Sequence, residues 1–98
     1  MKTTSYRADL LKRLEDPEYA AGYLTECFEE GEAEFLLGLR DVVEAHGGVR
    51  QLAKAAKLSR ESLYRLLSRN GNPRLSSLST IMSVLGIQLH FSPKDQAA

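Results

Sequence analysis

The chain has 98 residues, with 13 Lys and Arg, 13 Asp and Glu and a formal net charge of zero. This length suits one small domain spanning residues 1–98, and 43% hydrophobic with 27% charged residues is ordinary for a soluble protein. No apolar run approaches the ~18–20 residues of a membrane span, and the N-terminus lacks a secretory pattern, so we expect a cytoplasmic protein without membrane contact.

Apolar residues recur with helical spacing through most of the chain, which predicts about six helices and an all-α fold. Asp16-Pro17 is typical of a helix start, and Gly31 of a helix end. The first three helices are expected at roughly 5–15, 17–30 and 33–46. Apolar positions indicate three more, between Val49 and Ala56, Leu63 and Leu67, and Leu78 and Leu85.

The pattern changes after Gly86, where Ile87, Leu89 and Phe91 alternate with polar residues and predict a short strand over 87–92. A single strand leaves its backbone donors and acceptors unpaired. It could pair with the same strand of a second copy across a two-fold axis, or fold back and only resemble a strand. We expect the first, a homodimer.

The neutral total conceals two oppositely charged halves. Residues 1–46 contain five cations and eleven acids, a net −6, whereas residues 47–98 contain eight cations and two acids, a net +6. The acidic helical half covers 5–46, and the basic region covers 48–87. Such asymmetry predicts two surfaces with different partners, and the alternative is two solvated helix faces.

The basic region has the spacing of a helix–turn–helix, because two short helices are joined by three or four residues around Lys57-Leu58-Ser59. With Leu63 facing the core, Glu61 and Arg65 point the opposite way. Arg can donate two hydrogen bonds to guanine, and Glu can accept one from cytosine. Cations expected at DNA phosphates are Arg50, Lys54, Arg69 and Arg74.

Residues 48–87 resemble the lambda-repressor-like, or Xre-like, helix–turn–helix family. The motifs that carry this likeness are Gln51-Leu52-Ala53, Leu58 to Tyr64, Asn70 to Pro73 and Leu78 to Ile87. Over roughly 6–92 the chain resembles the addiction-module antidote proteins, which are often found in prophages and grouped with HigA-type antitoxins. The longer motif series is Tyr23-Leu24, Glu29-Glu30-Gly31, Leu52-Ala53-Lys54, Ser59 to Tyr64, Gly71-Asn72-Pro73 and Leu85-Gly86.

This resemblance implies the antitoxin of a type II toxin–antitoxin module. Such a protein binds a co-encoded basic toxin, usually a RelE-type RNase, and represses its own operon as a dimer on double-stranded operator DNA. Carried over by position, the DNA-facing residues are Ser59, Arg60, Glu61, Ser62, Tyr64 and Arg65. Electrostatics points to a toxin-facing acidic stretch of Glu26, Glu29, Glu30, Glu32 and Glu34.

Two positions depart from the lambda-like pattern. Val49 stands where a supporting Gln often begins the first of the two helices. Lys57 stands where the turn often has a Gly with positive φ, and keeping that conformation would cost about 1 kcal/mol.

An enzyme is not expected, since the sequence has no nucleophile beside a base and no glycine-rich phosphate loop. Cys27 lies in an apolar stripe and is expected to be a buried, inert thiol. His46 and His90 lack neighbours at metal-ligand spacing, so no metal, cofactor or small-molecule ligand is expected. Two alternatives stay open: a stand-alone prophage transcriptional regulator without a toxin, and a protein-interaction module without DNA binding.

Overall fold

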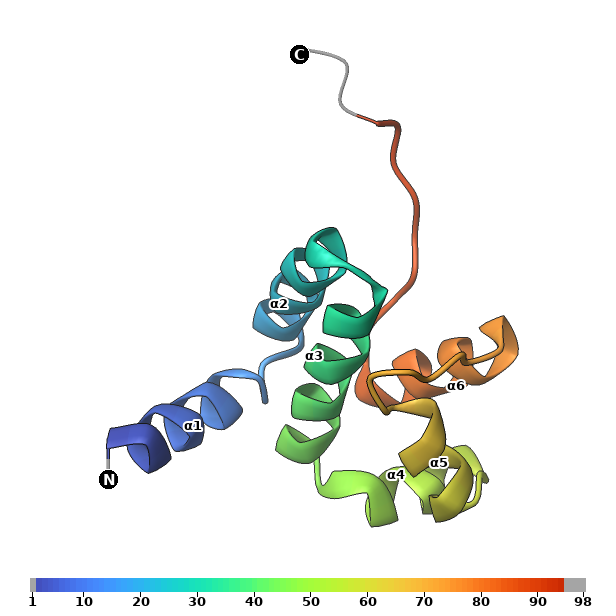
Figure 1. The fold of residues 1–98 in the computed structure, drawn as a ribbon, viewed down its shortest axis with the longest axis horizontal. Helices are drawn as coiled ribbons and strands as arrows, with labels where there is room; N and C mark the ends of the chain where they lie inside the picture. The colour runs from blue at the N-terminus through green and yellow to red at the C-terminus, as the bar shows by residue number, and fades with distance from the viewer. Residues whose placement is uncertain (1, 95–98) are drawn as a thin grey trace.

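The structure, a computed structural model, describes residues 2–94, with side chains from Tyr6 onward. These residues form six helices and no strand (Figure 1). The helices are α1 (Lys2–Arg13), α2 (Pro17–Glu30), α3 (Glu32–Ala45), α4 (Gly48–Ala56), α5 (Arg60–Leu66) and α6 (Leu75–Leu85). The predicted all-helical architecture of about six helices is confirmed.

Local capping chemistry sets the ends of α2. The side chain of Asp16 accepts a hydrogen bond from the Glu18 backbone N–H at 3.1 Å, and Pro17 is the first helical residue. Gly31 ends α2 and precedes α3 with φ 148°. L side chains rarely adopt this backbone conformation, so glycine permits the short connection between α2 and α3.

Helices α2 and α3 form an antiparallel hairpin, and α4, α5 and α6 gather at the far end of α3 (Figure 1). One cluster of buried apolar side chains joins the whole arrangement. Its fully buried members include Leu14, Leu39, Val42, Leu63, Leu67 and Ile81. The core therefore fixes α5 relative to α3 and leaves the polar side of α5 facing outward.

A small residue allows α2 and α3 to approach closely. A Cβ on Gly38 would lie 2.6 Å from Cys27 Sγ, well inside van der Waals contact. Cys27 is half-buried here rather than fully buried. Burial, followed by the negative charge of Glu30, raises the pKa of its thiol, so the thiol stays protonated near neutral pH.

Helix α1 is attached to α3 by two ion pairs and by a hydrogen bond at its C-terminal end. The Arg7 guanidinium donates to Asp41 Oδ1 at 2.9 Å and to Glu44 Oε1 at 2.7 Å. His46 Nε2 lies 2.9 Å from the carbonyl oxygen of Leu14, an acceptor that α1 itself leaves free. These contacts complement the burial of Leu14 beneath α3.

The strand predicted over 87–92 does not form within the described residues of the single chain. Gly86 adopts a left-handed conformation, and the Ile87 N–H donates back to Met82 O at 2.9 Å, which closes the end of α6. Ile87 still packs against the core, and the segment beyond it leaves the helices without helical or strand pairing up to residue 94 (Figure 1). No other described segment is extended alongside this one, so Leu89 and Phe91 stay exposed.

Candidate nucleic-acid interface

Helices α4 and α5 pack as a pair at the end of α3, joined by residues 57–59 as the sequence predicted. Leu52 and Ala53 of α4 and Leu63 of α5 are buried in the common core. The Leu58 N–H donates to Ala53 O at 3.1 Å and closes α4. Because the apolar faces meet in the core, the polar faces of both helices are presented to solvent.

Lys57 makes the turn between α4 and α5 with a backbone conformation that is unusual for its residue type. Its φ is 59° and its ψ 41°, the left-handed region, and within residues 2–94 no other non-glycine residue has a positive φ. This conformation costs about 1–2 kcal/mol for a residue with a Cβ. The turn thus keeps its shape without the expected glycine, at a cost in stability.

Ser59 begins α5 as its N-cap. Its Oγ accepts from the Ser62 backbone N–H at 3.0 Å and donates to Ser62 Oγ at 2.8 Å. These bonds hold Arg60, Glu61 and the half-buried Ser62 in the first turn. The structure therefore gives Ser59 a structural role, and Arg60 and Glu61 remain exposed at the end of α5 where a recognition helix meets bases.

Exposed cations lie on α5, on the neighbouring α4 and just before α6. Arg65 lies one turn beyond Glu61 on α5, Arg50 and Lys54 lie one turn apart on α4, and Arg74 precedes α6. Among the side chains of residues 6–94, these four and Arg60 form no ion pair with a carboxylate. Their charges are therefore not neutralised by a carboxylate of the described chain, and contact with phosphates stays a prediction.

Arg69 and Glu34 form an ion pair with each other, unlike the other predicted phosphate-contacting cations and toxin-facing acids. Arg69 Nη2 lies 4.0 Å from Glu34 Oε2, so the loop after α5 approaches the start of α3. Glu26, Glu29, Glu30 and Glu32 are exposed near the turn between α2 and α3, whereas Glu34 is half-buried. The structure thus brings four of the five predicted toxin-facing acids together on the surface and turns the fifth toward a cation.

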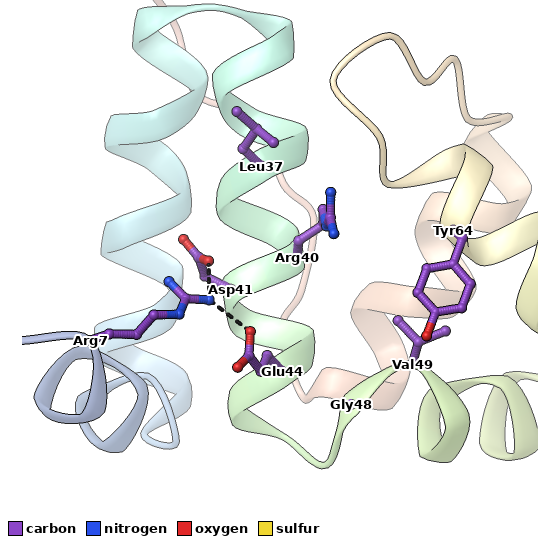
Figure 2. Close-up of a pocket in the computed structure, with 8 residues that line it drawn as sticks. All are labelled: Arg7, Leu37, Arg40, Asp41, Glu44, Gly48, Val49 and Tyr64. Carbon is purple, nitrogen blue, oxygen red and sulfur yellow. Dashed lines mark hydrogen bonds and ion pairs between the residues drawn. The ribbon is translucent and has the colours of Figure 1, made fainter. Parts of the chain in front are cut away.

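Tyr64 lies in a cleft of about 380 Å³ that runs along α3 (Figure 2). Its ring extends from α5 beside Val49 of α4, and Arg40 of α3 faces the same space. Tyr64 is 58% exposed, so its hydroxyl remains accessible while the ring covers Val49. Sequence reasoning missed Arg40, although it is the one Lys or Arg between residues 14 and 49.

The described part of the chain lacks the features of a metal site and of a membrane span. No three His, Cys, Asp or Glu side chains there gather as a metal site would require. In the same residues, no helix combines the length and the apolar character that crossing a bilayer demands. His46 instead contacts the Leu14 carbonyl, which connects α3 to α1.

The whole helical region, from α1 through the segment after α6, matches a known family. A family model described as "Probable addiction module antidote protein" covers residues 4–93. The chain belongs to this family. An uncharacterised protein of Haemophilus influenzae is 35% identical over 81 residues, which is 82% of each chain. No solved structure matches.

Membership in the antidote family indicates an antitoxin role in a toxin–antitoxin module and implies a toxin partner in general. The predicted antidote resemblance is therefore confirmed. The narrower likeness to HigA-type antitoxins and to lambda-like helix–turn–helix domains stays a prediction, and so do the individual contacts assigned above.

Proposed function

We propose that this antidote represses its own operon by binding double-stranded operator DNA through α5. The observation that carries the proposal is a set of exposed cations on α4, on α5 and at the start of α6 that form no ion pair among the side chains of residues 6–94. Arg60, Glu61 and Arg65 are the base-reading residues, because all three are exposed on α5. Glu61 and Arg65 lie on the side away from Leu63, and Arg60 lies at the edge of that face in the first turn. Arg50, Lys54 and Arg74 supply phosphate contacts that fix the orientation of α5.

The same protein neutralises a basic toxin of the RelE type by means of its acidic half. Between Pro17 and Leu39 the chain contains six acids and no Lys or Arg. A field of one sign attracts a partner of opposite charge and raises its rate of association. Repression and neutralisation would then use separate surfaces of one small protein.

A homodimer would place two copies of α5 on successive half-sites. The segment after Ile87 supports this arrangement, because residues 88–91 have no backbone hydrogen bond among the described residues and Phe91 is 96% exposed. Pairing with the same segment of a second copy would satisfy its backbone and bury Leu89 and Phe91 across a two-fold axis. Sedimentation of a chain ending at Gly86 should show a loss of dimer, and an unchanged dimer would contradict the pairing.

DNA binding is tested by gel shift on the promoter fragment upstream of the gene. Arg60→Ala and Arg65→Ala should each weaken specific binding, since a good bidentate base contact is worth ~1–3 kcal/mol. Lys12→Ala, which removes an exposed cation from α1, is the matched control. Affinity should fall steeply with salt as counterions are released. The absence of a specific shift at low salt would favour an interaction module without DNA binding.

Toxin binding is tested by co-expression with the product of the adjacent reading frame, followed by co-purification and growth rescue. Rescue together with co-purification supports the antitoxin. DNA binding without either result would favour a stand-alone regulator.

A further inference from the structure

A pair of aromatic rings, one exposed and one half-buried, lies at the turn between α2 and α3. Phe28 in the last turn of α2 and Phe35 in the first turn of α3 meet edge to face, with ring centroids 5.5 Å apart and an interplanar angle of 88°. Phe35 packs against the core, whereas Phe28 is 59% exposed. The core thus holds Phe35 in place, and Phe35 holds Phe28 in a defined orientation at the surface.

Exposed carboxylates surround this pair. Glu29 and Glu30 follow Phe28, and Glu32 begins α3. None of the three forms an ion pair among the side chains of residues 6–94. The negative charge of Glu30 is also felt at Cys27, whose pKa is raised by burial and then by this carboxylate. An apolar centre with a charged rim is the usual plan of a protein–protein interface.

The stability of α2 does not explain the position of Glu29 and Glu30. They occupy the last turn of α2, which contains no basic residue. Negative charge at the C-terminal end of a helix is unfavourable, because the unsatisfied carbonyls there already carry partial negative charge. Glu32 and Glu34 differ, since they lie in the first turn of α3, where the helix dipole favours acids.

We propose that Phe28 is the apolar anchor of the toxin-binding surface, entering a pocket on a basic protein whose rim of Lys and Arg pairs with Glu29 and Glu30. The inference rests on the proposed function, namely that the acidic half binds a basic toxin. Nucleic acid is repelled by the same charges, so the occupant is a protein. The surface lies at the opposite end of α3 from α4, a helix length of about 20 Å away.

The anchor is tested by calorimetric titration of the full chain with the basic protein encoded by the adjacent reading frame. Phe28→Ala should raise Kd by about tenfold or more, since truncating a central aromatic anchor removes much of an interface's binding energy. Tyr6→Ala, which removes another exposed aromatic ring from α1, should leave Kd unchanged. Circular dichroism would verify that both variants fold.

The charged rim is tested by Glu29→Lys and Glu30→Lys. Each should raise the Tm of the free chain, because a cation in the last turn of α2 complements its dipole, while raising Kd for the toxin. A purely structural role would not produce these opposite changes. Glu15→Lys is the control, because it changes the net charge by the same amount near the other end of α2.

Failure of the Phe28 anchor and failure of toxin binding give different results. If the unmodified chain binds the toxin and Phe28→Ala binds equally well, the anchor is wrong and toxin binding itself stands. If Glu29→Lys and Glu30→Lys leave Kd unchanged, the rim is wrong. If the unmodified chain does not bind, the proposed toxin neutralisation is overturned together with the anchor.

Discussion

The hydroxyl of Tyr23 donates a 2.7 Å hydrogen bond to Asp41 Oδ2 and thereby joins α2 to α3. Asp41 uses its other oxygen to accept from Arg7 at 2.9 Å, so one carboxylate connects three helices. Figure 2 shows Arg7 reaching from α1 to Asp41 and Glu44 along one side of α3. The positions of α1 and α2 on α3 are thus coupled through a single side chain.

We expect Tyr23→Phe to lower the free energy of unfolding by about 1–2 kcal/mol, because it removes a half-buried hydrogen bond to a charged acceptor. Denaturation by urea measures this change. Tyr19→Phe is the control, since Tyr19 is exposed and its hydroxyl makes no hydrogen bond among the described side chains. Equal stability of both variants would show that the Tyr23 bond contributes nothing.

Tyr23 also predicts a loss of stability at alkaline pH. Burial, followed by the hydrogen bond to Asp41, raises the pKa of Tyr23 well above its usual value near 10. Above pH 10 the unfolded chain releases this proton while the folded chain retains it, so the unfolding free energy falls as pH rises. Tyr23→Phe should abolish this slope. A Cys27→Ala background is best, because the raised pKa of Cys27 acts in the same direction.

The sequence was sufficient to place the helices because their ends depend on local chemistry. Asp16 and Ser59 each cap a helix within three residues, and α2 begins at the Asp16-Pro17 start that the sequence predicted. Helix α6 begins at Leu75, whereas the sequence predicted a start near Leu78. The first turn was missed because Leu75 is exposed and does not belong to the apolar stripe that marks the helix. Its N-cap, Arg74, makes no capping side-chain bond that the sequence could have signalled.

The features that sequence reasoning missed depend on contacts between distant residues. Arg7 and Asp41 are 34 residues apart, and no periodicity predicts their pairing. The cleft beside Tyr64 arises only when α3 meets α4 and α5. The strand over 87–92 failed for the related reason that strand pairing requires a second extended segment, and alternating side chains do not supply one.

The left-handed backbone at Lys57 predicts a stabilising substitution. Lys57→Gly should raise the free energy of unfolding by up to about 1 kcal/mol, because glycine adopts φ 59° without strain. The gain is smaller than the full strain because glycine also increases the conformational entropy of the unfolded chain. Lys57→Ala removes the same charge and keeps the Cβ, so it should give no gain. If both variants are stabilised equally, charge and not backbone strain is responsible. Thermal unfolding at a fixed pH compares the two.

The contact between Gly38 and Cys27 predicts opposite effects for the same substitution at two glycines. Gly38→Ala should destabilise the chain, since the new Cβ would lie 2.6 Å from Cys27 Sγ. Gly22→Ala should stabilise it by roughly 0.5–1 kcal/mol, because alanine is the better helix former and nothing lies within 4 Å of its Cβ.

Adding Cys27→Ala to Gly38→Ala should restore part of the lost stability by removing the clashing sulfur. This rescue requires a double-mutant cycle, with the unfolding free energy of all four chains measured in the same buffer. If the two changes are simply additive, the cost of Gly38→Ala arises elsewhere in the packing of α2 against α3, and the close approach at Cys27 is not its cause.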